Sequence, residues 1–425
     1  MRSLPVRSWV AFATCVAATL GACSGRGGDA TPSTPAADGG TTSSSGGSSN
    51  GGSSSGIGTS NDGGSVASGG DGGAPGNPGA CTGGVPAAGA LADTSHPTTV
   101  VGTGTAASCT YDALTAAVAK GGVITFDCGG APVAISVSST LNVPIGVDTV
   151  IDGGGLVTLD GGGGARILSL NSPNWQSNTH RLTLQRLTLT GGKATPTDAI
   201  PTAPAPCSQG WDDGQGGAVY VRDGNLTVVD CTFTNNQAAP LGPDTGGGAI
   251  YVQGSLQGVL AVRSTFTGNR ASNGGAIGGL FAELDVYESV FRGNQAVGKD
   301  ANNDIPCPDA GPNGSCCEAM NNGQNEVGSG GNGGALYSDG NSVNVVLCGD
   351  DIEDDAAGVN AFGGGLFFTS DNLQGTLTIT DTTMTGNTGG SWTNVSTGSV
   401  TNAGTAIGVN AKSISITGSA LQGYP

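Results

Sequence analysis

Charged side chains recur three residues before an apolar position that repeats along the chain. They are Arg186, Asp230, Arg263, Glu288 and Asp381, with Gly349 in the remaining repeat. Stacked strands lie about 4.8 Å apart, so side chains of opposite charge in successive repeats could form a ladder of surface ion pairs. The alternative is a catalytic face on which Arg186 or Arg263 acts as a base. The alternation of charge itself favours the ion-pair ladder.

An acidic cluster follows in the later part of the chain, and its carboxylates suit calcium, a hard cation that binds several oxygens. Two of its members, Asp350 and Asp355, fall at positions that repeat through the stack, which leaves Asp351, Glu353 and Asp354 as candidate ligands. The spacing is not that of an EF-hand loop. Calcium is therefore the one metal or cofactor that we consider, and the sequence contains no motif for another.

Two tryptophans lie in segments that interrupt the repeats. Trp211 is followed by Asp212 and Asp213, and Trp392 lies in a later interruption. A flat apolar ring beside carboxylate acceptors is suited to binding a sugar, so these four residues are candidate ligand contacts. The alternative is that each tryptophan packs its own loop onto the repeats. Asp212 and Asp213 are also the one aspartate pair outside the cluster that could serve a hydrolase, which requires two carboxyl groups.

These residues are positioned by a repeated unit. The motif GGA followed by an aliphatic residue opens each unit, and a signature such as FTGN closes it. The opening motifs begin at Gly216, Gly247, Gly274, Gly333 and Gly364, and the signatures at Phe233, Phe266, Phe291 and Met384. Successive closing residues Phe233, Phe266 and Phe291 are 33 and 25 residues apart, and recurrence at such a spacing indicates a stacked repeat architecture.

Alignment of the units on their closing residue predicts how each one folds. Apolar residues stand seven and five residues before it, as in Leu226 and Val228, and these two share one face of a strand. The next recurrent position lies two residues before the closing residue, three residues beyond Val228 in this unit. In a single strand an odd spacing would place it on the opposite face, so the chain must turn a corner there. Gly and Asn supply the backbone conformations with positive φ. We expect three short strands per unit and an all-β parallel solenoid.

Asparagine recurs three residues after the closing position, at Asn236, Asn269, Asn294 and Asn387. We expect these amides to form a buried structural ladder from repeat to repeat. The insertions at 192–214, 239–246, 297–332 and 388–403 all leave the unit at the same corner. They should therefore stack into one wall of loops, which is the expected binding surface.

The first residues carry export signals. Residues 1–22 have a basic start and a short apolar run, as in a secretion signal. The run ends in Leu-Gly-Ala before Cys23, which predicts a lipoprotein whose Cys23 is lipidated. Residues 23–80 are rich in Gly, Ser and Thr and read as a flexible tether. The folded domain is expected at 81–425.

A short helix pattern at Tyr111–Lys120 is expected to cap the open end of the stack. Cys109 and Cys128 flank it and could form a disulfide, as expected in an oxidising compartment. Cysteines 307, 316 and 317 crowd one insertion, with Cys348 on the next repeat. Nine cysteines remain after Cys15 and Cys23, so an odd one is expected to be free.

The opening GGA motifs and the FxxN signatures resemble the polymorphic outer membrane protein repeat. The run VIDGGGLVTLDGGGGARILSL, from Val150 to Leu170, resembles the start of pectin-lyase-like right-handed parallel β-helix proteins. The resemblance covers residues 105–425 and implies that fold, with a cap helix and long loop insertions. It also implies that the alternative for Arg186 and Arg263 is a calcium-dependent polysaccharide lyase. Related chains often end in an outer-membrane barrel; here we expect the lipid on Cys23 to serve as the anchor.

Composition fits a secreted protein. The 425 residues include 80 glycines, and the net charge of −18 disfavours nucleic acid and anionic membrane surfaces as partners. We expect a lipid-anchored protein at the outer membrane or cell surface whose membrane contact is the anchor alone. The favoured function is non-enzymatic adhesion, or recognition of a polysaccharide or cell-surface ligand. The alternatives are the lyase and a structural envelope protein.

Overall fold

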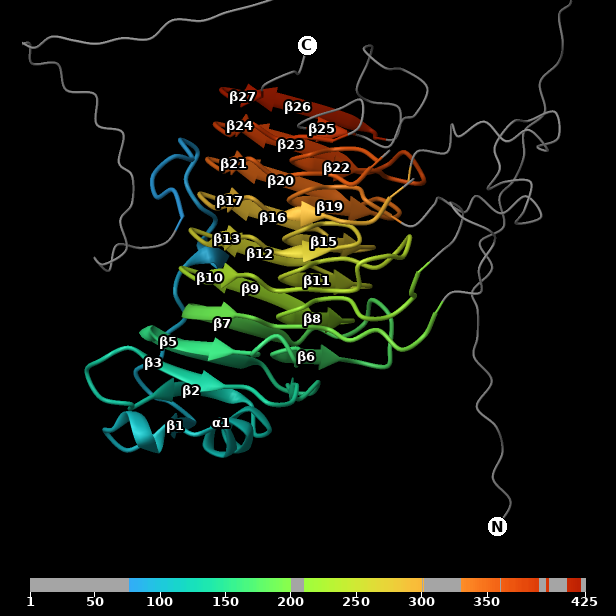
Figure 1. The fold of residues 1–425 in the computed structure, drawn as a ribbon. Coiled ribbons are helices and arrows are strands. Elements are labelled where there is room, and N and C mark those ends of the chain that lie inside the picture. The colour runs from blue at the N-terminus through green and yellow to red at the C-terminus, as the bar shows by residue number, and fades with distance from the viewer. Residues whose placement is uncertain are drawn as a thin grey trace, which may run out of the picture. The chain divides into compact units, whose positions relative to one another are not determined.

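The computed structural model describes residues 76–199, 210–299, 301, 330–359, 361–389 and 411–421, together with the strand at 395–396. These residues belong to one compact unit, Gly69–Pro425. They are mostly strand, and the strands are stacked one above the next along the unit (Figure 1). The expectation of an all-β parallel protein is met.

The strands form a 17-stranded sheet, which we call the larger sheet, an eight-stranded smaller sheet and a two-stranded ribbon. The larger sheet contains β1 (Thr99–Val101), β2 (Gly122–Phe126), β3 (Val133–Ser136), β5 (Thr149–Asp160), β7 (Arg181–Thr190), β9 (Asn225–Val229), β10 (Thr232–Thr234), β12 (Val259–Val262), β13 (Thr265–Thr267), β16 (Leu284–Tyr287), β17 (Val290–Arg292), β20 (Asn344–Cys348), β21 (Asp351–Glu353), β23 (Thr376–Thr380), β24 (Thr383–Thr385), β26 (Ser413–Thr417) and β27 (Ala420–Leu421). The smaller sheet contains β4 (Leu141–Asn142), β6 (Leu168–Asn171), β8 (Val219–Arg222), β11 (Ile250–Gln253), β15 (Ile277–Leu280), β19 (Leu336–Asp339), β22 (Leu366–Phe368) and β25 (Val395–Ser396). The ribbon pairs β14 (Arg270–Ala271) with β18 (Gln295–Ala296).

Every strand-to-strand pairing in the described part of the chain is parallel. The register is the one that the sequence repeat predicts. Phe233 lies between Leu189 and Phe266, and Phe291 lies between Phe266 and Ile352. Equivalent residues of successive repeats therefore form columns.

One opening motif was placed a residue too far along the chain. The structure pairs Leu336 with Leu366, so Gly363 is the equivalent of Gly333, and the motif begins there rather than at Gly364. The cause is the third residue of the motif. Gly365 replaces the usual alanine. Three consecutive glycines can be aligned with the two glycines of the motif in two ways, so the sequence alone does not show where the motif begins.

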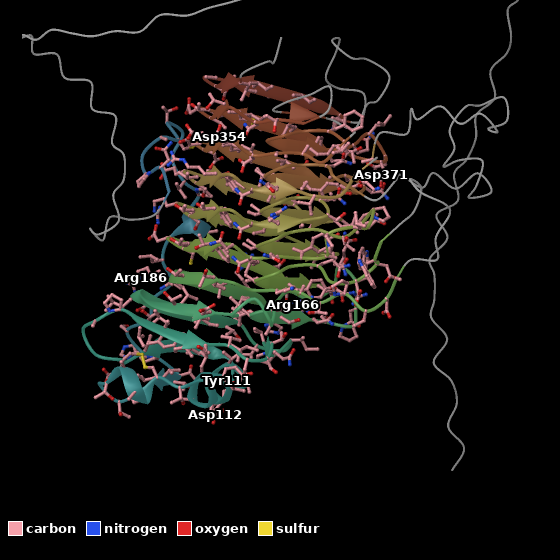
Figure 2. The ribbon with its side chains drawn as sticks, in the orientation of Figure 1. Tyr111, Asp112, Arg166, Arg186, Asp354 and Asp371 are labelled. Carbon is pink, nitrogen blue, oxygen red and sulfur yellow. A yellow bond between two sulfur atoms is a disulfide. The ribbon has the colours of Figure 1, made fainter. Side chains whose placement is uncertain are left out.

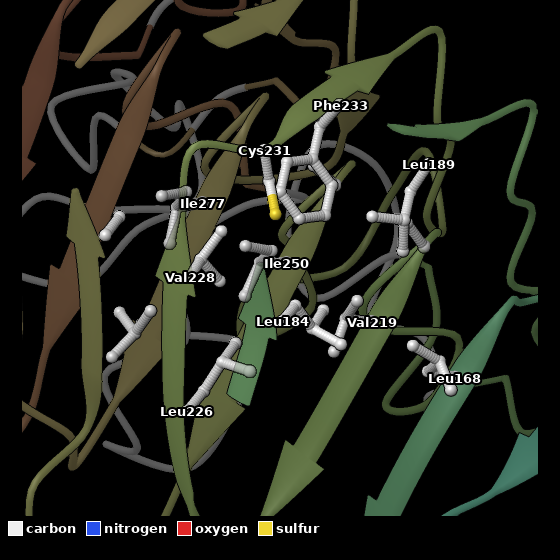
Figure 3. Close-up of a cluster of buried hydrophobic side chains, with 14 of the residues drawn as sticks. Leu168, Leu184, Leu189, Val219, Leu226, Val228, Cys231, Phe233, Ile250 and Ile277 are labelled. Carbon is white, nitrogen blue, oxygen red and sulfur yellow. The ribbon is translucent and has the colours of Figure 1, made fainter. Parts of the chain in front are cut away.

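The interior between the sheets is filled by these columns. Leu226, Val228 and Ile250 are fully buried and point inward from both sheets (Figure 3). The phenyl rings of Phe233, Phe266 and Phe291 stack with centroids 4.9 and 4.7 Å apart. Such aromatic burial is a large stabilising term in a protein core.

One helix, α1 (Tyr111–Val118), packs against β1 and β4 (Figure 1). Thr110 caps it by accepting a hydrogen bond from the backbone of Ala113, and Leu114 is among the residues that it buries. The helix covers the first strands, as a solenoid cap must. It ends two residues before the predicted Lys120.

Two disulfides join described cysteines. Cys109 is bonded to Cys128, as the sequence suggested, and Cys81 to Cys348. Cys231 is a buried free thiol, and burial raises its pKa to about 12. Cysteines 307, 316 and 317 lie outside the described residues, as do Cys23 and the export signals.

Candidate functional site

The charged row lies at a backbone bend. Arg186, Asp230, Arg263 and Glu288 all have positive φ, between 44° and 53°. This is the left-handed conformation that the corner between the two strands of each repeat requires. The row is therefore a structural position first, and the exposure of its side chains varies, since Glu288 is buried whereas Arg186 is partly exposed.

The arginines of this row are engaged in ion pairs. The Arg263 guanidinium lies 2.7 Å from Asp230, its neighbour in the row. Arg186 instead pairs with Asp152, a residue of β5 that the sequence did not single out. The bond to Asp152 raises the pKa of Arg186, whereas a general base needs a lowered one. The ion-pair interpretation fits this geometry better than the catalytic one.

A segment that we call the strap, residues 76–94, runs across this row. Its Asn77 amide nitrogen donates to the Glu288 carbonyl, and Thr82 donates twice to the Asp381 carboxylate. Further along, Val85 packs on the apolar cluster of β9 and β12, and Thr94 donates to Asp152. The disulfide at Cys81 fixes the strap to β20. The charged row is therefore crossed by the chain itself.

The asparagines form a continuous ladder. The side-chain amide of Asn236 donates to Asn269, that of Asn269 to Asn294, and that of Asn294 to the carboxyl group of Asp355, each at 2.9 Å. Asn387 continues the ladder, because its side-chain oxygen accepts a hydrogen bond from the backbone N–H of Asp355. All five side chains are buried, and their bonds run between repeats. The ladder connects each repeat to the next.

The candidate calcium ligands face an arginine. Arg292 lies 3.0 Å from Asp351 and 3.1 Å from Glu353, so a guanidinium stands where a cation would bind. Asp354 follows at a bend with φ of 56° (Figure 2). Within the described ranges, no group of three His, Cys, Asp or Glu side chains is arranged to hold a metal ion.

The first insertion is folded on itself. The Asp213 carboxylate accepts four hydrogen bonds from Thr197 and Asp198, and these outweigh burial and lower its pKa. Trp211 is half-buried and its backbone donates to Leu241 of the next insertion, while Asp212 is exposed. Trp392 lies outside the described residues. The predicted contact of Trp211, Asp212 and Asp213 with a ligand together with Trp392 therefore stays a prediction.

The described parts of the insertions cover an aromatic column on the outer face of the smaller sheet. Tyr220, Tyr251, Tyr337 and Phe367 stand at equivalent strand positions, and all are at most 8% exposed. Tyr251 donates to the Asp244 carbonyl oxygen in the second insertion, and Tyr337 packs against Phe362. The second insertion thus covers the outer face of the smaller sheet at Tyr251, whereas the insertions at 297–332 and 388–403 lie largely outside the described residues.

A groove lies at another corner, where the chain passes from the smaller sheet to the larger one. Its volume is about 350 Å³. Gln176, Ser255, Leu256, Phe281, Ala282, Glu283, Asn341, Ser342 and Val343 line it. We call it the corner groove. It is lined by side chains from three successive repeats and by the loop that precedes β7.

The groove exists because one corner is shorter than its neighbours. Leu280 and Leu284 are in register with Gln253 and Val259 below and with Asp339 and Val345 above. The neighbouring corners need five residues, 254–258 and 340–344, whereas this one needs the three residues 281–283. A corner two residues shorter than both neighbours leaves a notch between them.

The corner at 223–225 is equally short, but it is filled. Its flanking residues, Arg222 and Leu226, are in register with Gln253 and Val259. The loop at 172–180 lies over it, because Ser177 and Asn178 donate backbone hydrogen bonds to Asp223. The same loop reaches the second notch, where the Gln176 side chain donates to the Phe281 carbonyl oxygen, but it leaves the space at 281–283 open.

Trp175 lies at the tip of that loop beside the open notch. Its indole is 45% exposed and contacts Phe281 edge-to-face, with ring centroids 5.7 Å apart. The Arg222 guanidinium lies over the indole ring, and the ring rests against Gly254. Phe281 itself has φ of 51°, an unusual conformation for a bulky residue and one often found at functional sites. The tryptophan is held in place with part of its surface open to solvent.

Sequence reasoning did not find this site. Trp175 precedes the first GGA motif and lies in no insertion between repeats, so alignment of the repeats does not single it out. The shortened corner was visible as a spacing of four residues between Leu280 and Leu284, against six between Gln253 and Val259. That spacing was the one available signal.

Comparison with known proteins returned nothing: no family model, no curated protein and no solved structure matches this chain. Among the described residues, no helix has the length and apolar character needed to cross a membrane.

Proposed function

We propose that the described unit is a right-handed parallel β-helix and that the chain is a lipid-anchored protein displayed at the bacterial cell surface. The parallel sheets and the residue columns support the helix, and crossovers between parallel strands are right-handed in about 98% of cases. The resemblance of the repeats to polymorphic outer membrane protein repeats supports the same fold. The secretion signal at 1–22 and Cys23 support the anchor.

We further propose that the protein binds a polysaccharide at the corner groove and does not cleave it. The observation that carries this proposal is Trp175, an exposed and fixed aromatic ring beside an open groove. Aromatic rings bury the apolar faces of sugar rings, while polar groups such as Ser255, Asn341 and Ser342 accept and donate hydrogen bonds to hydroxyls. The repeat spacing would let one chain of sugar units extend along the stack.

The lyase hypothesis has weaker support. Arg186 and Arg263 are held by carboxylates, and the strap lies across their row. The candidate calcium ligands Asp351 and Glu353 are paired with Arg292. No contact in the described structure brings an arginine and a calcium site to one groove.

The experiment compares purified full-length protein with a Trp175→Ala variant on a panel of polysaccharides. Loss of the aromatic contact should weaken binding about tenfold. Leu91→Ala is the matched control, because Leu91 is 41% exposed and lies in the strap rather than at the groove. Equal affinity of the native protein and the Trp175 variant would contradict the proposal.

The same incubations distinguish the alternatives. Ultraviolet absorbance would rise if unsaturated sugar products formed, and a calcium-dependent rise lost in Arg263→Ala would establish a lyase. Absence of binding to every polysaccharide would leave adhesion to another surface or a structural role in the envelope.

A further inference from the structure

The corner groove contains a carboxylate and no basic side chain. Among the residues that line it, Glu283 is the one charged group, and neither lysine nor arginine is present. A site for a uronic acid polymer would need cations to pair with the carboxylates of its ligand. The charge of this groove therefore disfavours acidic polysaccharides.

Glu283 is fixed in position from one side. The Asn344 side-chain amide donates to Glu283 Oε1 at 2.9 Å, and Thr376 donates to Asn344 at 2.7 Å. The bond from Asn344 uses one of the two carboxylate oxygens of Glu283. Among the described residues, no ion pair joins Glu283, so its charge is not compensated within the groove's surroundings.

A second carboxyl group adds to the negative potential. Asp285 lies two residues further along, on the same outer face of β16, because alternate strand residues share a face. Burial and the nearby Glu283 raise its pKa to about 6. No basic group opposes this shift at Asp285, and Arg222, the basic side chain described at the site, lies on the Trp175 indole rather than on these carboxyl groups.

We propose that the corner groove selects polysaccharides whose sugar rings carry free amino groups. This inference rests on the proposed polysaccharide binding and specifies its ligand class. The sugar ring packs beside Trp175 and Phe281, and its ammonium group lies against Glu283. The carboxylate favours a cationic ligand, whereas the indole, which already contacts the Arg222 guanidinium, supplies apolar surface for the sugar ring.

The test uses a β-1,4-linked glucosamine hexasaccharide and its fully N-acetylated counterpart. Affinities for full-length protein are measured by calorimetry at a pH where the sugar amine is protonated. The salt concentration is high enough to screen the net charge of −18. The free-amine oligosaccharide should bind about tenfold more tightly.

Two variants locate the preference. Glu283→Gln keeps an oxygen that can accept from Asn344, so it should fold and bind both oligosaccharides with similar affinity. Asp112→Asn removes one negative charge from α1, away from the groove, and should leave the preference unchanged (Figure 2).

Three results would overturn the inference. If the acetylated oligosaccharide binds as tightly as the free amine and Trp175→Ala weakens both, polysaccharide binding stands and the amine selectivity is wrong. If the preference persists in Glu283→Gln, it arises from net charge rather than from the groove. If neither oligosaccharide nor any other polysaccharide binds, the proposed function fails as well.

Discussion

At the residue scale, two buried carboxyl groups stand where neighbouring repeats have neutral side chains. Asp355 occupies a position of the asparagine ladder, and Asp350 occupies the position of Ser264 and Ser289. In each, one oxygen accepts a hydrogen bond and the other, Oδ2, is buried without a partner. Burial raises the pKa of both groups well above the usual value. A proton on Oδ2 would restore the missing donor.

For Asp355 the missing donor can be located. Asn269 and Asn294 each donate to the backbone oxygen of a phenylalanine in the preceding repeat, Phe233 and Phe266. The equivalent oxygen for Asp355 belongs to Phe291. We infer that Asp355 is neutral in the folded protein and donates there in the way an asparagine does.

This assignment predicts a stability that depends on pH. The folded-state pKa of Asp355 is raised, so above the unfolded pKa of about 4 the folded state holds the extra proton. The contribution of Asp355 to stability is therefore greatest below that pH and falls as pH rises toward the folded pKa. Asp355→Asn should remove part of this fall and raise stability at neutral pH by about 1–3 kcal/mol, measured by urea unfolding.

The gain from Asp355→Asn should vanish at pH values below about 4, where the aspartate is protonated in both states. Asp112→Asn, an exposed substitution, is the control and should change little. A variant that is less stable than the native protein at neutral pH would contradict a neutral Asp355.

At the scale of elements, the corner length decides where the surface is open. The three-residue corner 281–283 lies between two five-residue corners, and the groove is the space that the two absent residues would occupy. Loop insertions are usually tolerated by a scaffold whose strands stay in register.

Replacing residues 281–283 by the sequence of 254–258, GSLQG, should therefore fill the notch without unfolding the stack. Polysaccharide binding should fall at least about tenfold, because the groove and the Phe281 contact are both lost. Circular dichroism checks that the strand content is kept. As a control for insertion itself, two glycines are added between Gly162 and Gly163, which lie outside the groove and have open space around them, and this variant should keep full binding. Full binding by the variant with the lengthened corner would rule out the corner groove as the site.

At this scale the sequence predicts the structure correctly where residues of one type recur at a regular spacing. The closing residues, the inward pairs such as Leu226 and Val228, and the cap helix followed from spacing alone. The placement of all four insertions at one corner stays a prediction, and whether Trp211 is open or packed depends on three-dimensional contacts that the sequence does not contain. The strap was not predicted, because residues 76–94 have no periodicity and are held by bonds to residues up to 299 positions away.

At the scale of the whole molecule, the charged row and the corner groove lie on different parts of the unit's surface. The charged row lies on one side, where Arg186 and Asp354 are seen, and Asp371 lies on the opposite side (Figure 2). The row is crossed by the strap, which the Cys81–Cys348 disulfide fixes across 267 residues of sequence. The corner groove belongs to the corners between the sheets, away from the strap. This separation lets one side stabilise the stack while the corner groove stays open to solvent.

Hydrogen–deuterium exchange of the full-length protein with and without a bound polysaccharide tests the central claim most directly. The corner groove predicts slower exchange, on binding, in the segments 172–178, 254–258, 281–283 and 340–344. The strap should exchange at the same rate in both states. Protection confined instead to the insertions, at 192–199, 210–214 and 239–246, would place the binding surface on the loop wall and contradict the account.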